Sequence, residues 1–600
     1  MPIGRTPDSI LKASVAVPPV LPPVRRLRDH FAPVCVAVAA PNPALLFEQA
    51  ATAVQESSFE APLIELRMDA LDEPEAGVLA FAAFRCAHPG AALLVTCRRT
   101  DGGGAYTGTP QEQLTLLARF AVAGASVIDL ELETLEVVAP SALEQWADIL
   151  ERSGTLVLVS AHDFERTGDL DRTLRRLRTL GKPCRAAVYK VVSTAERLAD
   201  NLAMLEWIER ASREVPVVGI CMGEAGLPSR VLALSAGALF TFAATSAGAG
   251  TAPGQVTAEK LLRQYRADLL RRAKHYGVVR DVDAPEGAAR AFQAENPAIE
   301  ETRLYGVAGN PVSHSLSPAM HNAAFQAAGV DAVYLPLHTT SVDDLLAFAK
   351  ALPLSGLSVT MPWKVDILPF LAEVDPLARS IGAVNTVVRR EDGSLLGMNT
   401  DAAAVVEPLR QYFDRRAGDA GGANSLDGLR VLLLGAGGAA RAAAFGLRAE
   451  GALVSILNRT LTSAEHLAQE SGTRVHVPDE AQPYDAVINA TPAGMLGQPQ
   501  ALPLVDAALL RGVRVVFEMV YRPTETPLTL LAHSLGIDVI YGLEMFVHQG
   551  MRQWELWTAQ PAPMPAMRAA LEQALQEQEA AAGDTGSGSV QPGAAPAKPQ

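Results

Sequence analysis

The sequence predicts an α/β protein, with an eightfold βα barrel in its first half and two smaller α/β domains in its second half. Three observations lead to this fold class. Eight short, β-rich apolar runs, each followed by a helical pattern, lie between residues 30 and 245. A second alternation of apolar and helical segments begins at Leu304. Near residue 435, a glycine-rich turn joins an apolar run to a helical stretch.

The composition favours a folded enzyme that acts on small molecules. Of the 600 residues, 49% are hydrophobic and 20% are charged, which is ordinary for a folded protein and provides enough apolar material for large cores. The net charge of −15 and the pI near 5.3 argue against a nucleic-acid surface, because phosphate binding requires clustered Lys and Arg. We therefore expect small-molecule substrates and no nucleic-acid partner.

The cysteines and the first residues indicate a cytoplasmic protein. The five cysteines are odd in number, widely spaced and without a CxxC pair, so we expect reduced thiols and neither a disulfide framework nor a metal site. The N-terminus lacks the basic, apolar and small-residue order of a signal peptide, and its Pro-rich stretch from Val17 to Val24 is typical of an extended tail. The cysteines are Cys35, Cys86, Cys97, Cys184 and Cys221.

One uncharged run, Val231–Ala258, is long enough to cross a bilayer. It is rich in Gly, Ser, Thr and Pro, however, and a buried helix followed by a strand is the favoured interpretation. No membrane association is expected.

The eight runs of the first half predict a closed barrel, because they begin about 24 to 34 residues apart and alternate with helical patterns. They are Val34–Ala40, Leu63–Asp69, Ala92–Arg98, Ser126–Leu132, Thr155–Ala161, Ala186–Val192, Val215–Met222 and Leu239–Ala244.

Polar residues gather at the C-terminal ends of these runs, where barrel enzymes place their chemistry. They are Glu65, Arg67, Asp69, Arg98, Glu131, His162 and Asp163, and Lys190 lies within the sixth run. Charges inside apolar strands are costly to bury, which favours a functional role. Two alternatives stay open: Glu65 with Arg67 could be a structural ion pair, and His162 could cap its strand.

Lys190 is harder to assign to structure alone, because its neighbours are Val188, Tyr189, Val191 and Val192. An ammonium in an apolar barrel is disfavoured unless it loses its proton, and a neutral lysine is a nucleophile. A lysine amine with a nearby histidine suggests iminium chemistry, in which the amine condenses with a ketone and the histidine moves the proton that becomes acidic.

Five segments resemble type I 3-dehydroquinate dehydratases, in the family order: Leu63–Asp69, Ser160–Phe164, Lys190, Gly226–Arg230 and Thr251–Gln255. The resemblance implies that Lys190 forms the Schiff base, that His162 takes the C2 proton of 3-dehydroquinate and then protonates the departing hydroxyl, and that Glu65 orients or tunes this histidine. It also implies that Arg230 holds the substrate carboxylate. Further contacts to hydroxyls and carboxylate would come from Arg67, Arg98, Thr251 and Gln255.

One position departs from that family. Its members commonly carry an acid just before a glycine pair after the third strand, where this sequence has Gly102. The adjacent Asp101 is the candidate to supply the missing carboxylate. Without it, His162 would lose one electrostatic partner and dehydration would be slower, with the reaction type unchanged.

The second half begins with a strand pattern at Leu304 and then places Ser315 and Ser317 just before a helix with Pro318 near its first turn. Hydroxyls and free amides at a helix N-terminus suit a carboxylate ligand, although ordinary N-capping is the favoured interpretation of this motif taken alone. Farther on, Lys364, Asn385 and Asp401 stand at strand or loop ends. A lysine there is a reasonable proton donor to a ketone, whereas the alternative is a surface salt bridge.

The run Arg430–Leu434 leads into Gly435-x-Gly437-x-x-Ala440 and then a helical stretch, which is the dinucleotide-binding pattern in its required context. About 20 residues later the strand Ala452–Leu457 ends in Asn458-Arg459-Thr460, where an acid would bind the ribose of NAD. An arginine attracts a 2′-phosphate instead, so NADP is the expected cofactor. The predicted cofactor contacts are Gly435, Ala436, Gly437, Gly438, Ala439, Asn458, Arg459 and Thr460.

These motifs together resemble shikimate dehydrogenases from about Leu304 to Leu575. The resemblance implies Lys364 and Asp401 as the catalytic pair, with hydride from NADPH, and Ser315 and Ser317 on the substrate carboxylate. It implies contacts around the substrate ring from Thr360, Asn385, Tyr521 and Gln549.

The two halves support one another, because the enone produced by dehydration, 3-dehydroshikimate, is the ketone that the second half would reduce. The alternatives are a Schiff-base aldolase barrel joined to an unrelated reductase, a metabolite-sensing regulator, and a second half acting on quinate. The sequence makes no prediction of oligomeric state. The expected segments are residues 1–30, an extended tail; 31–280, a (β/α)8 TIM barrel; 281–302, a linker; 303–405, a substrate-binding domain; 406–575, a Rossmann-type NADP-binding domain whose last helices return to the substrate domain; and 576–600, a disordered tail.

Overall fold

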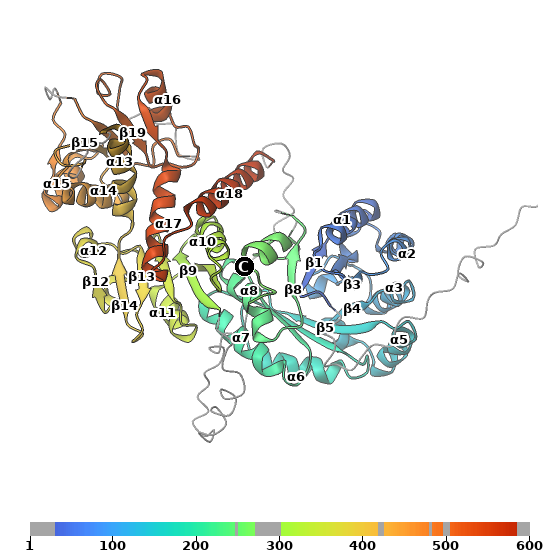
Figure 1. Cartoon of the computed structure of the whole chain (residues 1–600). Helices are drawn as coiled ribbons and strands as arrows, with labels where there is room; N and C mark the ends of the chain where they lie inside the picture. The colour runs from blue at the N-terminus through green and yellow to red at the C-terminus, as the bar shows by residue number, and fades with distance from the viewer. Residues whose placement is uncertain are drawn as a thin grey trace, which may run out of the picture. The chain divides into compact units, whose positions relative to one another are not determined.

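A computed structural model describes residues 31–246, 250–270, 302–417, 425–478, 483–495 and 505–584. The chain divides into two compact units, Met1–Glu301 and Thr302–Gln600 (Figure 1). The predicted tail over residues 1–30 and all but Thr302 of the predicted linker lie outside the described residues. So does the end of the chain after Asp584, whereas helix α18 continues past position 576, where the C-terminal tail was predicted to begin.

The first unit is the predicted barrel. Its eight strands are all parallel, in the order β7-β6-β5-β4-β3-β2-β1-β8. The two ends of this order meet where the backbone N–H of Leu239, just before β8, donates to the carbonyl of Val217 in β7 at 2.8 Å. The strands are β1 (Val34–Val38), β2 (Leu63–Arg67), β3 (Ala92–Thr96), β4 (Val127–Glu131), β5 (Leu156–His162), β6 (Val188–Thr194), β7 (Val217–Met222) and β8 (Thr241–Ala244). The helices are α1 (Pro43–Glu56), α2 (Gly77–Ala87), α3 (Pro110–Val122), α4 (Leu132–Val137), α5 (Pro140–Arg152), α6 (Leu170–Leu180), α7 (Leu198–Ala211) and α8 (Leu227–Ala236).

The barrel interior is apolar in one layer and polar in the next. One core cluster takes residues from all eight strands, among them Leu63, Leu94, Val127, Leu158 and Val188. Side chains of a strand alternate between its two faces, so the residues two positions later share the inward direction. Those residues are Glu65, Thr96, Asp129, Ser160 and Lys190. The same two-residue period therefore places a ring of polar side chains one layer nearer the C-terminal ends of the strands.

The uncharged run at Val231–Ala258 is part of this barrel. Its start completes helix α8, and strand β8 follows, as the sequence predicts. Within the described part of the chain, none of the helices has both the length and the apolar character needed to cross a membrane.

The second unit contains two six-stranded sheets. The first is mixed, in the order β10-β9-β11-β13-β14-β12, with β13 antiparallel to both of its neighbours. Its strands are β9 (Arg303–Gly309), β10 (Ala332–His338), β11 (Gly356–Val359), β12 (Glu373–Val374), β13 (Thr386–Arg389) and β14 (Leu395–Met398). Its helices are α10 (Ser317–Ala327), α11 (Val342–Ala351) and α12 (Pro376–Ile381).

The last two helices of the described residues, α17 (Gly542–Thr558) and α18 (Met564–Asp584), pack against this first sheet. A shared core contains Phe325 of α10, Trp554 of α17, and Met567 and Leu571 of α18. The chain thus leaves the first sheet, builds the second one, and returns.

The second sheet of this unit is parallel, in the order β17-β16-β15-β18-β19-β20. The strand order reverses between β15 and β18, which is where doubly wound sheets bind ligands beyond the carboxyl ends of their strands. Its strands are β15 (Arg430–Leu434), β16 (Leu453–Leu457), β17 (Arg474–Val475), β18 (Ala486–Asn489), β19 (Val515–Glu518) and β20 (Asp538–Ile540). The helices of this part are α13 (Asp401–Ala417), α14 (Gly438–Ala449), α15 (Leu461–Ser471) and α16 (Pro527–Ser534).

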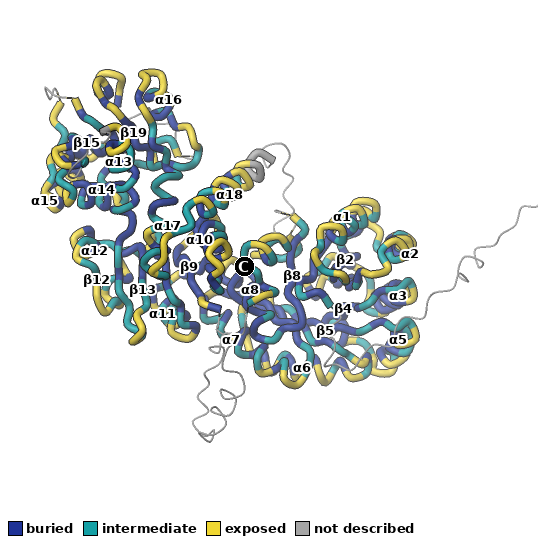
Figure 2. Tube along the Cα trace, viewed as in Figure 1, coloured by how far each residue is buried: buried dark blue, intermediate teal, exposed yellow. Residues whose placement is uncertain are grey.

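Helices cover both faces of the second sheet. Val431 and Leu433 of β15 belong to one core cluster, and Leu432 and Leu434 of the same strand belong to the other. A continuous apolar strand is what a parallel sheet buried on both faces requires. Figure 2 shows the result, with buried strands in dark blue and the outer surfaces of the helices in yellow.

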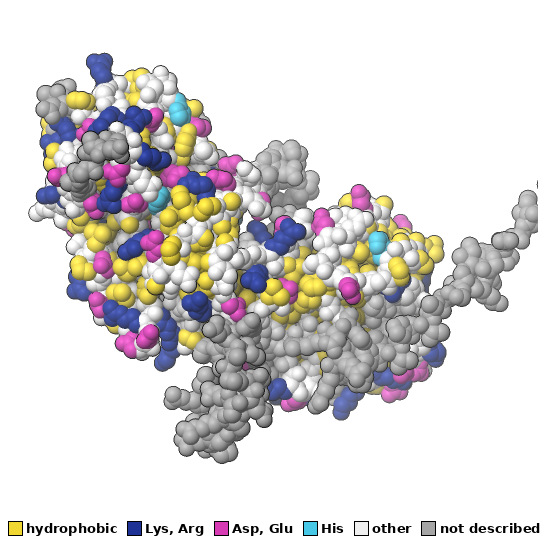
Figure 3. All heavy atoms as spheres, in the orientation of Figure 1, with side chains coloured by type: hydrophobic (Ala, Val, Ile, Leu, Met, Phe, Trp, Pro, Cys, Tyr) yellow, Lys and Arg dark blue, Asp and Glu magenta, His cyan; other side chains and the backbone are white. Residues whose placement is uncertain are grey.

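The charged side chains do not form a single basic surface on the face drawn in Figure 3, where Lys and Arg of the described residues are interspersed with Asp and Glu. This distribution accompanies the net charge of −15.

Candidate active sites

Lys190 lies inside the barrel, with only 5% of its surface exposed. Its Nζ is 3.3 Å from Asp129 Oδ2, 4.0 Å from Glu65 Oε1 and 4.3 Å from the centroid of the Phe242 ring. The sequence predicts an apolar environment for this amine, and the structure adds two carboxylates to it. The amine therefore stands in a water-poor site built for a positive charge on its nitrogen.

Asp129 is a functional candidate that the sequence analysis missed. Its carboxylate accepts from Arg98 at 2.8 Å and from Ser160 Oγ at 2.5 Å, besides its contact with Lys190. Burial alone would raise the pKa of Asp129, but the charges of Lys190 and Arg98, together with these hydrogen bonds, hold it below its usual value. The signal was present, because an Asp two positions after Val127 in a buried strand must face the interior.

Glu65 faces the same amine. It accepts a hydrogen bond from Thr96 Oγ1 at 2.7 Å, on the neighbouring strand. The contacts that the structure gives it are thus with Thr96 and Lys190, whereas the family resemblance assigns it to His162.

His162 ends strand β5, next to the strand that carries Lys190. Ser160 is the register partner of Lys190, and His162 stands two residues farther on. Its ring stacks on Phe164, with the centroids 5.9 Å apart. Burial, followed by the charges of Arg98, Lys190 and Arg67, lowers the pKa of His162 well below its usual value. A neutral imidazole is the form that can accept a proton, and among the described residues its buried Nδ1 has no hydrogen-bond partner.

Asp101 is paired with a neighbouring arginine. Its carboxylate pairs with Arg99 at 2.5 Å, and 48% of the side chain is exposed. At Gly102, a Cβ would lie 3.3 Å from Glu133 Oε2, so the carboxylate of Glu133 stands beside the position where family members carry their acid. Burial, the largest effect, raises the pKa of Glu133. This residue too was missed, because it belongs to a different segment, helix α4.

The remaining barrel candidates are cationic or polar groups, and they differ in how far other residues of the barrel already bind them. Arg230 is 1% exposed and donates from one guanidinium nitrogen to the carbonyl of Pro253 at 3.0 Å, while its Nε has no partner among the described residues. Burial lowers the pKa of Arg230 to about 10. Arg67 forms a bidentate pair with Asp69 at 3.0 and 2.7 Å. Gln255 Oε1 accepts from the backbone N–H of Thr251 at 2.8 Å.

In the second unit, Lys364 and Asp401 are in contact. Lys364 Nζ donates to Asp401 Oδ2 at 2.6 Å, and their side chains are 29% and 8% exposed. Lys364 follows β11 and Asp401 is the first residue of α13, so two separate elements meet here. Asn385 Nδ2 donates to the other carboxylate oxygen of Asp401 at 2.7 Å, which fixes the orientation of the carboxylate.

The other predicted ring and carboxylate contacts lie on the loops and helices of the same unit. Ser317 opens α10, and its backbone N–H donates to Ser315 Oγ at 3.3 Å, whereas the N-cap residue, Leu316, makes no side-chain capping bond. Burial, the largest effect, raises the pKa of Tyr521, whose ring lies 5.6 Å from that of Phe546. Thr360 and Gln549 are half-buried, the first beyond β11 and the second on α17.

The glycine-rich turn lies at the end of β15, beside the reversal of strand order. Gly435 has a φ of +109°, which favours glycine, and α14 begins at Gly438. A Cβ at Gly437 or Gly438 would meet nothing within 4 Å. The backbone is therefore open at a helix N-terminus, the geometry that suits a pyrophosphate. Asn458 donates to the carbonyl of Thr460 at 3.0 Å, just after β16.

Family models match both units. Residues 34–270 match "Type I 3-dehydroquinase". In the second unit, residues 307–387 match "Shikimate dehydrogenase substrate binding domain", 420–495 match "Shikimate / quinate 5-dehydrogenase" and 542–572 match "Shikimate 5'-dehydrogenase C-terminal domain".

Individual proteins also resemble this chain. A chloroplastic bifunctional 3-dehydroquinate dehydratase/shikimate dehydrogenase of Arabidopsis thaliana is 35% identical over 486 residues, covering 78% of this chain and 73% of that protein. A shikimate dehydrogenase (NADP(+)) of Symbiobacterium thermophilum is 39% identical, over 46% of this chain and 96% of that protein. A crystal structure of shikimate 5-dehydrogenase from Thermus thermophilus with NADP(H) and shikimate is 37% identical, covers 45% of this chain and 99% of that one, and has a TM-score of 0.40.

Proposed function

This chain belongs to the family of bifunctional 3-dehydroquinate dehydratases/shikimate dehydrogenases, and from that premise we propose how its residues carry out the two reactions. The first unit dehydrates 3-dehydroquinate to 3-dehydroshikimate, and the second reduces 3-dehydroshikimate to shikimate with NADPH. The observation that carries the first half is the buried amine of Lys190 between two carboxylates.

In the barrel, the Lys190 ammonium gives up one proton and the free amine attacks the substrate ketone. The ketone oxygen then leaves as water, with that proton and one from the nitrogen, which forms an iminium. Asp129 stays ionised, since its pKa is held low, and stabilises the positive nitrogen at the 3.3 Å contact. The iminium acidifies the C2–H, and neutral His162 takes that proton. His162 then gives the proton to the departing hydroxyl, and hydrolysis of the iminium releases the enone and the amine.

Arg230 binds the substrate carboxylate. It is a buried guanidinium whose Nε has no partner in the described part of the chain, and a carboxylate would provide an anion that those residues do not. Arg67, Arg98, Thr251 and Gln255 are proposed to contact the hydroxyls and the carboxylate.

In the second unit, Lys364 donates a proton to the ketone oxygen, and Asp401 orients the ammonium through the 2.6 Å contact. The hydride for the carbonyl carbon would come from NADPH when it is bound. The open turn from Gly435 to Ala439 would hold its pyrophosphate, and Asn458, Arg459 and Thr460 would hold its 2′-phosphate. Ser315, Ser317, Thr360, Asn385, Tyr521 and Gln549 are proposed as the substrate contacts.

Single-site variants separate the two activities. Lys190→Ala should abolish dehydration and leave the reduction of 3-dehydroshikimate unchanged, whereas Asp401→Ala should do the reverse. Steady-state kinetics on each half-reaction, with quinate as an additional substrate, make the comparison. Loss of both activities in either variant, or of neither, would refute the assignment.

Family membership favours this enzyme over the aldolase and regulator alternatives. The five cysteines are free, as expected for reduced thiols. The cytoplasmic location stays a prediction, and the relative from Arabidopsis is chloroplastic.

A further inference from the structure

Behind the Lys364–Asp401 pair lies a buried chain of hydrogen bonds that ends at His321. Asn385 Nδ2 donates to Asp401 Oδ1 at 2.7 Å, and Thr386 Oγ1 donates to Asn385 Oδ1 at 2.8 Å. Gln553 Nε2 donates to Thr386 Oγ1 at 3.0 Å, and His321 Nε2 lies 3.2 Å from Gln553 Oε1. The chain joins α10, α17, β13 and the start of α13.

The direction of every bond in this chain is fixed by the neighbouring groups. Gln553 Nε2 also faces the carbonyl oxygen of Asn385 at 3.5 Å, and a carbonyl can only accept. Gln553 Oε1 must therefore be the acceptor from Ser358 Oγ at 3.0 Å and from His321. His321 thus carries its proton on Nε2, which agrees with a buried Nδ1 that has no partner among the described residues.

Asn385 is oriented in the same way. Its Oδ1 accepts from the backbone N–H of Thr400 at 2.8 Å, so its Nδ2 must point to Asp401. All four donors consequently point toward the carboxylate of Asp401. Hydrogen bonds aligned in one direction polarise one another and act most strongly where water is excluded.

Water is excluded from this chain. His321, Gln553 and Thr386 are 0% exposed, and Asn385 is 1% exposed. Burial, the largest effect, lowers the pKa of His321 to about 4, so the imidazole stays neutral and keeps its donor role at neutral pH. A buried amide with both ends satisfied is costly to rotate, because rotation would break four hydrogen bonds.

We propose that Gln553 is a positioning residue for ketone reduction, which holds Asn385 and Thr386 so that the carboxylate of Asp401 is oriented beside Lys364. Gln553 itself touches neither substrate nor cofactor in this proposal. The proposal rests on the function proposed above for Lys364 and Asp401.

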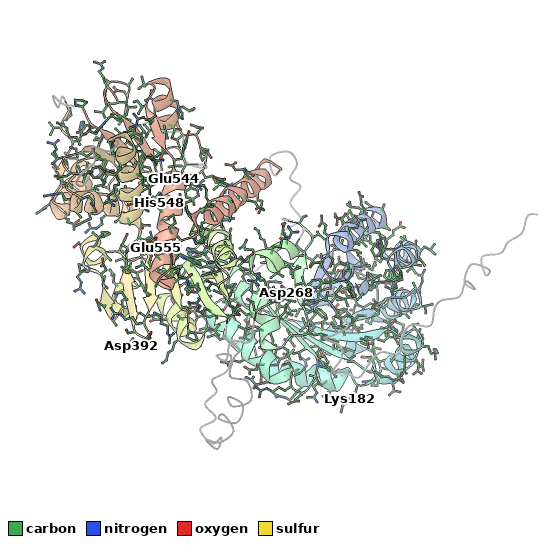
Figure 4. All side chains as sticks on the ribbon, in the orientation of Figure 1. Lys182, Asp268, Asp392, Glu544, His548 and Glu555 are labelled. Carbon is green, nitrogen blue, oxygen red and sulfur yellow. The ribbon has the colours of Figure 1, made fainter. Side chains whose placement is uncertain are left out.

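The test compares Gln553→Leu with Glu555→Gln in the full-length protein. Glu555 lies on the same helix, α17, and is labelled in Figure 4. Its carboxylate pairs with Arg552 at 3.1 Å, and both side chains are exposed. Gln553→Leu should lower the single-turnover rate of NADPH oxidation with 3-dehydroshikimate by about tenfold, since it removes the buried bond that orients Thr386 and, through it, the Asn385 amide that donates to the charged carboxylate of Asp401. The KM for NADPH should stay unchanged, because the glycine-rich turn is untouched. Glu555→Gln should match the unaltered protein.

Thr386→Val is the second variant, because valine keeps the shape of threonine and removes the hydroxyl that makes the two middle bonds of the chain. It should give the same split, with a lower rate and an unchanged KM for NADPH. The double variant should lose no more than the worse of the two single variants, since both break one chain.

Wild-type rates in Gln553→Leu or Thr386→Val, additive losses in the double variant, or a loss of NADPH binding that parallels the loss of rate would each overturn the proposal. Asp401→Asn distinguishes a failure of the proposed function from a failure of the positioning role of Gln553. If Asp401→Asn retains full activity, the proposed function of the pair fails. If it is inactive while Gln553→Leu is normal, only the present inference fails.

Discussion

Arg230 carries a guanidinium that is 1% exposed and has no acidic partner among the described residues. If it binds the substrate carboxylate, Arg230→Ala should lower kcat/KM for 3-dehydroquinate by roughly 30- to 150-fold, which corresponds to about 2–3 kcal/mol for a buried charge pair. Arg185→Ala is the matched control, because Arg185 forms only exposed ion pairs with Asp148 and Glu151. Dehydration kinetics measure both variants, and equal values for the two would contradict the assignment.

His321 makes stability depend on pH. Its pKa in the folded protein is lowered to about 4 by burial, and the unfolded chain regains the ordinary value of 6.5. As pH falls from 6.5 to 4, only the unfolded state gains the proton, so stability is lost over that window and no further below it. The loss should be about 2 kcal/mol at pH 5 and about 3 kcal/mol at pH 4.

Urea unfolding of the second unit at pH 7 and pH 5 measures this loss. His321→Asn should flatten the pH dependence, whereas His466→Asn, at an exposed position on α15, should leave it as it is. An unaltered slope in His321→Asn would show that another group is responsible.

Single residues differ in how far the sequence could predict them. Lys190, Lys364 and Asp401 stand in short motifs that resemble those of known families, so the residues next to them in the sequence are enough to identify them. His321 and Gln553 are 232 residues apart, and only packing of α17 against α10 brings them together. Asp129 could have been found from its strand alone, since the two-residue period points it inward.

At the scale of elements, the glycine-rich turn gives a sharp contrast between two neighbouring glycines. Gly437 has an ordinary φ of −83° and open space where a Cβ would stand, so Gly437→Ala should leave stability unchanged. The methyl group would occupy the approach of the pyrophosphate and raise the KM for NADPH by about tenfold or more. NADPH titrations of the reductase activity test this.

Gly435→Ala is the counterpart. Its φ of +109° and the carbonyl of Ala490 at 3.1 Å from the added Cβ make the substitution strained, so it should cost about 1–3 kcal/mol of folding free energy. Thermal unfolding distinguishes the two variants. If Gly437→Ala destabilises the fold as much as Gly435→Ala does, or leaves the KM unchanged, the turn does not hold the cofactor as proposed.

Elements were predictable where a periodic pattern is long and repeated. The sixth apolar run, Ala186–Val192, becomes β6 at Val188–Thr194, and the eight runs form the barrel as expected because the strands pair edge to edge in parallel and are buried on both faces. The antiparallel pair β13–β14 was not predicted, because its strands are four residues each and only half-buried along part of their length. Helix α18 continues past Leu575 because Gln578 still binds Arg522 and the carbonyl of His314.

At the scale of the whole molecule, the chain consists of two compact units, and each contains its own group of candidate catalytic residues. In the first, an imidazole and an amine stand on adjacent strands, and in the second, a lysine and an aspartate meet beside an open glycine-rich turn. The domain limits inside the second unit, at residues 405 and 406, stay a prediction. Family membership supports the prediction that the product of the first unit is the substrate of the second.

Covalent trapping at Lys190 tests the central claim most directly. Borohydride added to the protein with 3-dehydroquinate should reduce the iminium and fix one ligand per chain, and peptide mass spectrometry should place it on Lys190. The Lys190→Ala protein should take up none. An unmodified Lys190 under turnover, or an adduct on another lysine, would contradict the account.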